Sequence, residues 1–336
     1  MLAAVDNRIA VVTGGSAGLG RAIVRELAAR GWDVAVLARG REGLDGAVRD
    51  AEEAGVRSVG ISVDVADAAA LEAAADEIER ALGPIDLWVN NAMASVFGEF
   101  ADIEADDFDR VIRVVLGGFA NGTRTAVRRM IARDRGHIVQ VGSALAYRGI
   151  PLQSAYCAAK HGIKSLTESV LIELQHRGSA VRISEVDMPA MNTVQFSWVK
   201  NLLPHHPQPV PPIYQPEICA AILADVAERP RRRTWVGEST VLTILGTRLS
   251  ARLADAMALK SGFAQQDPHR GPQEFPPNLD RPIDGDHGAH GVFDARSHAI
   301  SPQTWAQRHR GLVALLGLLA AGTAAGIATG AARSAR

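Results

Sequence analysis

The sequence predicts an α/β protein in which a seven-stranded parallel sheet is doubly wound, with helices on both faces. Two observations lead to this prediction. Up to about residue 240, short apolar runs rich in Val and Ile alternate with longer stretches whose apolar residues recur every three to four positions. This alternation is typical of repeated βαβ units. The first apolar run also leads directly through a glycine-rich turn into a helical stretch, as the first unit of such a sheet should.

The expected elements follow in chain order. Strands are predicted at residues 9–13, 33–38, 58–64, 85–90, 137–143, 181–187 and 234–237, where the apolar runs are short and rich in β-branched residues. Helices are predicted between them, most clearly at residues 18–31 and 107–133. Gly31 and Gly136 stand where helices should stop.

The remainder of the chain differs in composition. Residues 203–216 concentrate prolines, which exclude regular helix and central strand, so we expect a loop beside a substrate pocket. Residues 267–303 are dense in Pro, Gly, Asp and His, which predicts an extended or poorly ordered linker. We therefore divide the chain into a main domain at 1–262, a linker at 263–310 and an apolar helix at 311–330.

The apolar segment at 311–330 has two interpretations. Its twenty residues carry no charge. A helix of this length can cross a bilayer about 30 Å thick. Gly322, Gly326 and Gly330 repeat every fourth residue, a spacing that permits close helix packing in membranes. The segment then anchors a cytoplasmic main domain to a membrane. The alternative is a buried or dimerising helix of a protein that does not enter the membrane.

Composition and charge exclude several classes of function. Apolar residues make up 47% and charged residues 22% of the chain, as in ordinary globular proteins. The net charge of -1 gives no reason to expect a nucleic acid partner. The two cysteines, Cys157 and Cys219, provide neither a disulfide framework nor a metal quartet, and the N-terminus lacks the apolar core of a signal peptide. These features favour a cytoplasmic location.

The turn after the first predicted strand, TGGSAGLG at residues 13–20, has the properties of a phosphate-binding loop. Glycines let the backbone turn tightly and approach a pyrophosphate, and the N-terminus of the following helix offers free N–H groups and partial positive charge. The spacing of Gly14, Gly18 and Gly20 is TGxxxGxG rather than the commoner GxGxxG. The alternative is a turn with a purely structural role. The position of the glycine loop after the first strand favours a dinucleotide site instead.

The end of the second predicted strand indicates which dinucleotide fits. A site for NAD places Asp or Glu there to hold the ribose 2'-hydroxyl, whereas a 2'-phosphate needs a cation. This chain has Ala38 followed by Arg39, which favours NADP. The alternative is that Arg39 and Arg41 only face solvent. Farther along, Asp64 could accept a hydrogen bond from the adenine amino group, and Asn90 and Ala92 could line the nucleotide.

Three side chains could carry proton chemistry beside the nicotinamide. Ser143 ends the fifth predicted strand, and Tyr156 follows at the start of the next helix, so their hydroxyl groups should converge. Lys160 lies one helical turn beyond Tyr156. A free tyrosine has a pKa near 10 and becomes an efficient base at neutral pH only when positive charge favours its anion. In this hypothesis Tyr156 exchanges the proton, Lys160 favours the phenolate and binds the ribose, and Ser143 holds the substrate oxygen.

The chain resembles the short-chain dehydrogenase/reductase family over residues 5 to 240. The resemblance lies in TGGSAGLG, NNA at Asn90 to Ala92, Ser143 and YCAAK at residues 156–160, which occur in the family's order and spacing. It implies a Rossmann fold, an NADP(H)-dependent carbonyl–alcohol oxidoreductase and a homodimer or homotetramer. It also implies a set of cofactor contacts: Gly14, Ser16, Gly18, Leu19, Gly20, Arg39, Asp64, Val65, Asn90, Ala92, Tyr156, Lys160 and Thr193.

Two departures from the family pattern support a second hypothesis. The usual NNAG reads NNAM, with Met93 at the last position, and Val115 stands where the family usually carries an asparagine that holds a water in the proton relay. Valine has no polar atom to replace that amide. The alternative function is therefore a catalytically weak NADP(H)-binding scaffold or redox sensor.

Other patterns have less specific interpretations. An isolated Tyr-x-x-x-Lys is usually a pair on a helix surface. The glycine loop and Ser143 make that interpretation less favoured in this sequence. Cys157 has no evident basic partner, so we expect a packing residue rather than a reactive thiol. Residues 284–290 read DGDHGAH but lack a recognised ligand spacing, so a solvated polar segment is favoured over a metal site. The expected pocket walls, residues 94–100, 144–152 and the loop after Met188, are largely apolar, which favours a hydrophobic ketone or alcohol.

Overall fold

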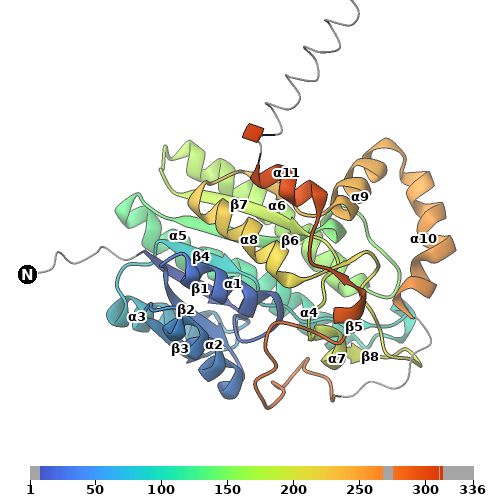
Figure 1. Ribbon diagram of the computed structural model, residues 1–336, viewed down its shortest axis with the longest axis horizontal. Coiled ribbons are helices and arrows are strands. Elements are labelled where there is room, and N and C mark those ends of the chain that lie inside the picture. Colours follow the sequence, from blue (N-terminus) through green and yellow to red (C-terminus); the bar gives the residue numbers. More distant parts are fainter. Residues whose placement is uncertain (1–7, 268–274, 310, 313–336) are drawn as a thin grey trace, which may run out of the picture.

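A seven-stranded parallel sheet organises the molecule (Figure 1). The computed structural model describes residues 8–267, 275–309 and 311–312. The strand order is β10-β7-β6-β4-β1-β2-β3, and each neighbouring pair is parallel. The strands of this sheet are β1 (Ile9–Thr13), β2 (Asp33–Ala38), β3 (Ser58–Ser62), β4 (Leu87–Asn90), β6 (His137–Ser143), β7 (Arg182–Met188) and β10 (Arg233–Trp235).

Helices cover both faces of the sheet. On one face α1, α2 and α8 pack together, whereas α3, α4, α5 and α6 pack on the other (Figure 1). The α-helices are α1 (Gly18–Ala29), α2 (Arg41–Glu53), α3 (Ala68–Ala81), α4 (Ala105–Ile112), α5 (Gly118–Arg133), α6 (Ser154–His176), α7 (Gln195–Trp198), α8 (Pro216–Glu228), α9 (Glu238–Leu249), α10 (Ala251–Gln266) and α11 (Pro302–Arg308). Short helical turns add η1 (Phe100–Asp102), η2 (Arg113–Gly117), η3 (Ala144–Ala146) and η4 (Asp294–Arg296).

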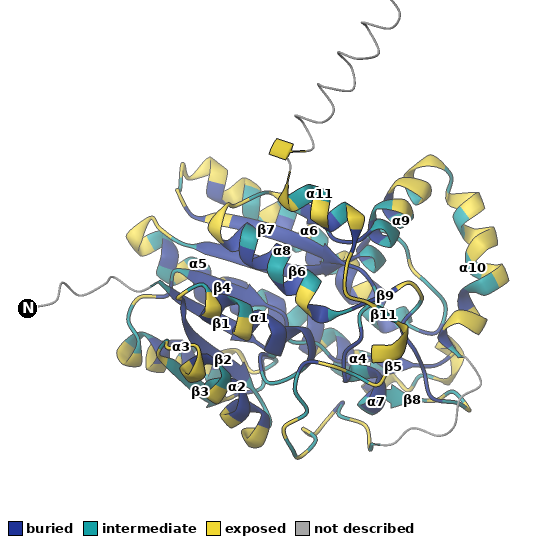
Figure 2. Ribbon diagram, in the orientation of Figure 1, coloured by how far each residue is buried: buried dark blue, intermediate teal, exposed yellow. Residues whose placement is uncertain are grey.

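The strand predictions agree with this sheet. Three strands, β1, β2 and β6, have the predicted bounds, and the other four shift by one to two residues at their ends. Strands β1, β4 and β6 are buried along their whole length, because helices cover both faces of a parallel sheet. Figure 2 shows the same layering, with a buried sheet between helices whose outer faces are exposed. The doubly wound fold predicted from the sequence is confirmed.

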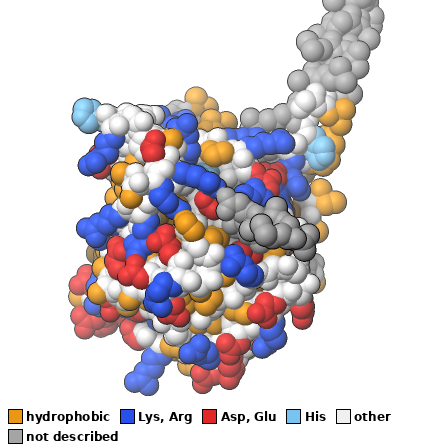
Figure 3. Space-filling model, turned by 90° about the vertical axis from the view of Figure 1, so that its left-hand side faces the viewer, with side chains coloured by type: hydrophobic (Ala, Val, Ile, Leu, Met, Phe, Trp, Pro, Cys, Tyr) orange, Lys and Arg blue, Asp and Glu red, His pale blue; other side chains and the backbone are white. Residues whose placement is uncertain are grey.

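The surface carries charge of both signs. On the face of the molecule drawn in Figure 3, Lys and Arg side chains are interspersed with Asp and Glu side chains. Elsewhere in the described residues, charged side chains form ion pairs, for example Arg129 with Glu72 at 2.5 Å and Arg30 with Asp225 at 2.8 Å. Such pairs each contribute little to stability. The mixed signs of the charges in Figure 3 give that face no continuous positive field.

His137, the first residue of β6, makes stability depend on pH. Its side chain is only 6% exposed, and burial lowers its pKa from 6.5 to about 4. The unfolded chain therefore binds a proton more readily than the folded protein, and the stability that neutral His137 provides is present above pH 6.5 and lost as the pH falls towards 4. We expect a loss of up to about 3 kcal/mol in the free energy of unfolding.

Urea unfolding of the wild type and of His137→Gln at several pH values between 7 and 4 checks this. The variant should lose less stability on acidification than the wild type. His176→Gln is the matched control, because His176 is exposed at the end of α6. Equal pH slopes for the wild type and His137→Gln would contradict the assignment.

Residues 275–309, which lie within the predicted linker, pack against the main body. Residues Leu279, Ala289 and Phe293 are at most 3% exposed, and β11 (Ser297–His298) pairs with β9 (Ile213–Tyr214). A second small sheet joins β5 (Val96–Phe97) to β8 (Lys200–Asn201). Composition alone predicted an extended or poorly ordered segment, whereas a few apolar side chains and the backbone groups described below fix the path of residues 275–309. Helix α10 also runs across the predicted boundary at residues 262 and 263, and the domain division stays a prediction.

The predicted apolar helix at 311–330 lies outside the described residues beyond Leu312. Within the described ranges, no helix combines the length and the apolar character needed to cross a bilayer.

Candidate active site

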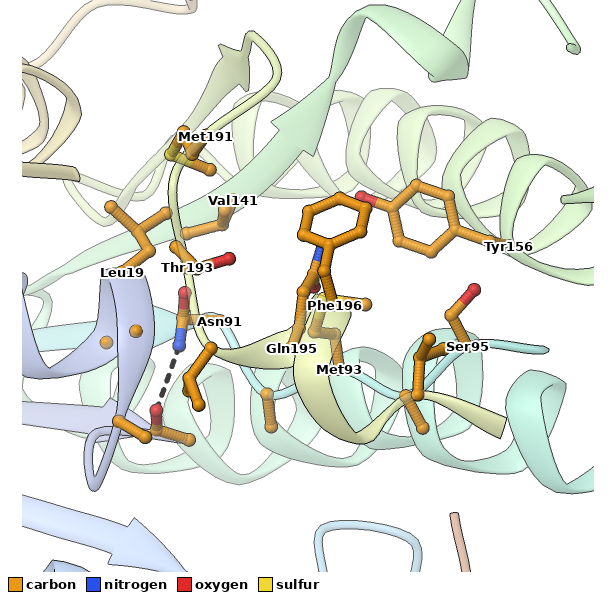
Figure 4. Close-up of a pocket in the computed structure, with 18 of the residues that line it drawn as sticks. Leu19, Asn91, Met93, Ser95, Val141, Tyr156, Met191, Thr193, Gln195 and Phe196 are labelled. Atoms are coloured by element: carbon orange, nitrogen blue, oxygen red, sulfur yellow. Dashed lines mark hydrogen bonds between the residues drawn. The ribbon is translucent and has the colours of Figure 1, made fainter. Parts of the chain in front are cut away.

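A cavity of about 400 Å³ lies at the carboxyl ends of the strands. Strands β1, β2 and β3 extend the sheet in one direction and β4, β6, β7 and β10 in the other, so the strand order reverses between β1 and β4. Ligands of open α/β sheets bind at this reversal. Gly14 follows β1 and Asn91 follows β4, and both line the cavity. Figure 4 shows the cavity between Leu19 of α1, Tyr156 of α6 and Thr193 of the loop after β7.

The loop between β1 and α1 needs glycine at particular positions. Gly14 has φ +66°, and a Cβ there would lie 2.7 Å from the Cα of Ala92. A Cβ on Gly20 would overlap the carbonyl oxygen of Gly14 and the amide of Asn91, and Asn91 Nδ2 donates to that same Gly14 oxygen at 3.2 Å. The loop and the strand end therefore form one closely packed unit. Gly18, Leu19 and Gly20 begin α1 and line the cavity, where the first N–H groups of a helix favour an anion.

The three candidate catalytic side chains line the same cavity. Ser143 ends β6 and is 7% exposed, and its Oγ accepts a hydrogen bond from the Leu145 N–H at 3.1 Å. Tyr156 lies in the first turn of α6, and its phenol points into the cavity (Figure 4). Lys160 is 2% exposed, and its Nζ lies 5.6 Å from the centre of the Tyr156 ring.

Burial shifts the pKa values of both Tyr156 and Lys160 towards their neutral forms. It raises the pKa of Tyr156 above its usual value, while a hydrogen bond with Ser143 acts in the opposite direction. It lowers the pKa of Lys160 from 10.5 to about 7, although Glu185 and Asp187 oppose this shift. The phenol is therefore protonated at neutral pH, as a proton donor requires, and the ammonium of Lys160 titrates near neutrality.

Lys160 has fixed partners in the protein. Its Nζ donates to the carbonyl oxygen of Val141 at 2.6 Å and lies 4.6 Å from the centre of the Phe119 ring. Val115, which stands where the family usually has asparagine, is fully buried in the π-helical turn η2. The valine itself offers no polar atom towards Lys160.

Two buried carboxyl groups lie on β7 near this lysine. Glu185 and Asp187 are fully buried, and Tyr147 donates to Asp187 Oδ2 at 2.9 Å. Arg233 pairs with Glu185 at 2.8 Å. Burial and the neighbouring Glu185 raise the pKa of Asp187 well above its usual value. Their negative charge favours the charged form of Lys160.

The predicted nucleotide end of the cavity is also charged. Arg39 lines it, and its guanidinium donates to the carbonyl oxygens of Leu279 at 3.1 Å and Asn278 at 2.5 Å. Asp64 lines it too and is paired with Arg110 at 2.6 Å. Burial lowers the pKa of Arg39. For Asp64, burial alone would raise the pKa, but the hydrogen bond from the Ala66 N–H and the Arg110 guanidinium lower it below its usual value. Arg41, by contrast, is exposed.

The cavity brings together most of the residues that the sequence predicts for it. Those that line it are Gly14, Ser16, Gly18, Leu19, Gly20, Arg39, Asp64, Val65, Ala92, Ser143, Tyr156, Lys160 and Thr193. Asn90 does not line it. Its side chain is fully buried and accepts from Trp88 Nε1 at 2.9 Å and donates to Gln140 at 2.9 Å and Thr123 at 3.1 Å. Asn90 therefore ties β4 to β6 and α5, and the next residue, Asn91, reaches the cavity instead.

Sequence reasoning missed two groups of cavity residues. Asn91 stood inside the quoted NNA motif, and the alternation of side chains along a strand could have pointed to it. The second group comes from the C-terminal segment: Asn278, Pro282, Ile283, Gly285 and His287. No local pattern places these residues at the glycine loop. The expected proline-rich loop does contribute, since Pro209, Val210 and Pro211 line the cavity.

The remaining reactive side chains lie in ordinary surroundings. Cys157 is 5% exposed, and burial raises the pKa of its thiol, as for an inert packing residue. In residues 284–290, Asp286 pairs with Arg21 at 2.8 Å and His290 with Glu217 at 2.8 Å. Among the residues that the structure describes, no group of three or more His, Cys, Asp or Glu side chains could hold a metal ion.

Comparison with known proteins identifies the family. The model of the short chain dehydrogenase family matches residues 8–200, which include the glycine loop, Ser143, Tyr156 and Lys160. The chain belongs to the short-chain dehydrogenase family. These proteins are oxidoreductases that act on small molecules with a nicotinamide cofactor, and the seven-stranded fold agrees with this membership.

Individual proteins are similar to this short-chain dehydrogenase over 55% to 78% of its length. It is 29% identical over 270 residues to the uncharacterized oxidoreductase YxnA of Bacillus subtilis (strain 168), covering 78% of this chain and 75% of that protein. Among solved structures, a variant of actinorhodin polyketide ketoreductase with NADPH shares 26% identity at a TM-score of 0.61, covering 68% of this chain and 95% of that one. A xylitol dehydrogenase bound to NAD+ shares 29% identity at a TM-score of 0.53, covering 55% and 70%.

Proposed function

We propose that this short-chain dehydrogenase is an NADP(H)-dependent oxidoreductase that interconverts a carbonyl and an alcohol on a hydrophobic substrate. One observation carries the proposal: Ser143, Tyr156 and Lys160 line a single cavity together with the glycine loop. Two hydroxyl groups and a buried amine beside a dinucleotide site are the groups that carbonyl reduction needs. No contact among the described residues favours a scaffold without turnover over this reaction.

Each side chain has a distinct role in the proposed reaction. Tyr156, protonated because burial raises its pKa, donates its proton to the substrate oxygen during reduction. Ser143 hydrogen-bonds the same oxygen and stabilises the negative charge that develops on it. Lys160 places positive charge near the phenol and thereby favours the phenolate that proton donation leaves behind. In alcohol oxidation Tyr156 acts as the base.

The cavity residues fit a dinucleotide phosphate. Gly14, Gly18 and Gly20 let the glycine loop pack closely against the end of β4 and Thr193 at the N-terminus of α1, where the pyrophosphate would bind. Arg39 follows Ala38 at the end of β2 and supplies the cation that a 2'-phosphate needs. Lys160 would bind the nicotinamide ribose and Thr193 the carboxamide. The bound cofactor would supply the hydride for reduction and accept it in oxidation.

The walls of the substrate end favour an apolar ligand. They include Leu145, Ile150, Phe196, Val199 and Val210. Few charged side chains reach this part of the cavity, so a hydrophobic ketone, aldehyde or alcohol fits better than a sugar or an acid. We also propose that the protein forms a homodimer or homotetramer, which its mass in solution would establish.

The test is a substrate panel. Purified protein is mixed with NADPH or NADH and with acetophenone, cyclohexanone or benzaldehyde, and oxidation of the cofactor is followed by absorbance. We expect turnover of at least one compound, faster with NADPH than with NADH. An extended panel that gives no turnover, while NADPH binds tightly, would reject the reaction and leave the scaffold function in its place.

A further inference from the structure

The C-terminal segment at residues 278–288, here called the strap, lies across the nucleotide end of the cavity. Figure 1 shows it in orange, passing below α1 before the chain returns to α11. It contributes Asn278, Pro282, Ile283, Gly285 and His287 to the lining of the cavity. These residues follow the end of the last strand of the main sheet, at residue 235, by 43 to 52 positions, yet they face the loop that follows the first strand.

The strap contacts two residues of the predicted cofactor site through its backbone. The carbonyl oxygen of Gly288 accepts the Gly18 N–H at 2.9 Å, at the first residue of α1. The carbonyl oxygens of Asn278 and Leu279 accept from the Arg39 guanidinium. An arginine has five N–H donors in a fixed plane, so two carbonyl partners orient Arg39 and leave other donors for a phosphate. Leu19 and Gly20 line the cavity beside Gly18. This end of α1 therefore still borders the space where the pyrophosphate would bind.

One ion pair holds the middle of the strap. Asp286 Oδ1 accepts from Arg21 Nη1 at 2.8 Å, and the Arg21 side chain is only 3% exposed whereas that of Asp286 is 32% exposed. Asp286 also packs against α2, because a Cβ on Gly46 would overlap its carboxylate. Asp50 pairs with Arg21 as well, at 2.5 Å, so removal of Asp286 does not leave the buried guanidinium without an anion.

Anchors fix the strap at both ends. At its start the Leu279 side chain is 1% exposed and packs in the main core, and the Asn278 N–H donates to the Trp198 carbonyl at 2.8 Å. Beyond its end, the Phe293 N–H donates to Asn192 Oδ1 at 3.0 Å. His287 lies edge-on to Trp198 at 4.9 Å between ring centres. The strap therefore joins the glycine loop to the loop after β7, and a cavity of about 400 Å³ remains beneath it.

We propose that the strap is a part of the cofactor site, forming the outer wall of its adenosine end, and that the Arg21–Asp286 pair controls how fast the dinucleotide leaves. This inference rests on the proposed NADP(H) cofactor. A cofactor enclosed between the strap and the ends of β2 and β3 leaves only when the strap opens. The interaction that holds the strap closed should therefore affect the rate at which the cofactor dissociates, and not the rate of the chemical step.

The first experiment measures release of NADPH from the full chain. Protein loaded with NADPH is mixed with excess NADP+ in a stopped-flow fluorimeter, for the wild type, Asp286→Asn and Asp284→Asn. Asp286→Asn should release NADPH about tenfold faster, the factor expected for loss of one charge-assisted hydrogen bond. Asp284→Asn makes the same charge change on an exposed residue of the strap that does not line the cavity, and its release rate should equal that of the wild type.

A second measurement uses the wild type alone and does not depend on variants that fold. Hydrogen exchange of the backbone N–H groups at residues 278–288 should slow when NADPH is added. An unchanged release rate in Asp286→Asn, tighter binding by that variant, or unchanged exchange at the strap would each overturn the inference while the proposed function stands. Failure of the wild type to bind NADPH would instead overturn both.

Discussion

Tyr156→Phe should lower the rate of ketone reduction by NADPH by about 10²–10⁴-fold, the range for loss of a general acid. The substitution removes only the phenol oxygen, which points into the cavity (Figure 4), and leaves the ring in place. NADPH binding should therefore remain measurable by fluorescence. Steady-state rates on the panel compound that the wild type reduces fastest give the comparison.

Tyr214→Phe is the matched control for this prediction. Tyr214 is also buried, at 4% exposed, and donates to Glu238 at 2.7 Å, but it does not line the cavity. This variant loses the same atom and should keep its rate within about a factor of two. If Tyr156→Phe retains the wild-type rate, proton transfer does not pass through the phenol and the assigned role is wrong.

Lys160→Met should abolish most activity and at the same time stabilise the fold at neutral pH. Loss of the ammonium removes the positive charge that favours the phenolate, so we expect a rate decrease of about 10²-fold or more. The amine is buried, and its pKa falls from 10.5 to about 7, which means that the unfolded chain binds this proton more tightly. The destabilisation by Lys160 is therefore complete below pH 7 and disappears as the pH rises to about 10.5.

Thermal unfolding and steady-state kinetics at pH 6, 7, 8 and 9 check both parts. The melting temperature of Lys160→Met should exceed that of the wild type at pH 6, by a difference that narrows at pH 9. Lys164→Met is the control, because Lys164 lies one turn farther along α6 and pairs with Glu168 at 3.0 Å. A Lys160→Met variant that is active, or less stable than the wild type at pH 6, would be inconsistent with the structure.

The sequence predicted the sheet well because its signals are local. A strand such as β6 is buried on both faces and therefore reads as a continuous apolar run with turn residues at its ends. The same holds for the glycine loop, whose close packing requires glycine at positions 14 and 20. The arrangement of Ser143, Tyr156 and Lys160 followed from strand and helix order, and all three do line one cavity.

The positions of the Asn90 side chain and of the strap could not be predicted from the sequence. Two adjacent asparagines lie on opposite sides of an extended chain, and only the positions of Gln140 and Thr123 show that Asn90 faces the interior. The strap depends on contacts between residues far apart in the chain, such as Arg21 with Asp286 and Arg39 with Leu279. Composition at residues 267–303 predicted an extended or poorly ordered linker, because neither the ion pair nor the backbone hydrogen bonds leave a periodic pattern in the sequence.

The most direct test of the proposed chemistry is transfer of deuterium. Wild-type protein is incubated with each ketone or aldehyde of the panel and NADPH deuterated at the transferable position of C4, in ordinary water, and the alcohols are analysed by mass spectrometry. Ser143, Tyr156 and Lys160 acting beside a nicotinamide predict an alcohol with one deuterium on its carbinol carbon, and about 10²-fold less of this product, or less still, from Tyr156→Phe on the same timescale. Absence of labelled alcohol with every compound, or equal label with Tyr156→Phe, would contradict it.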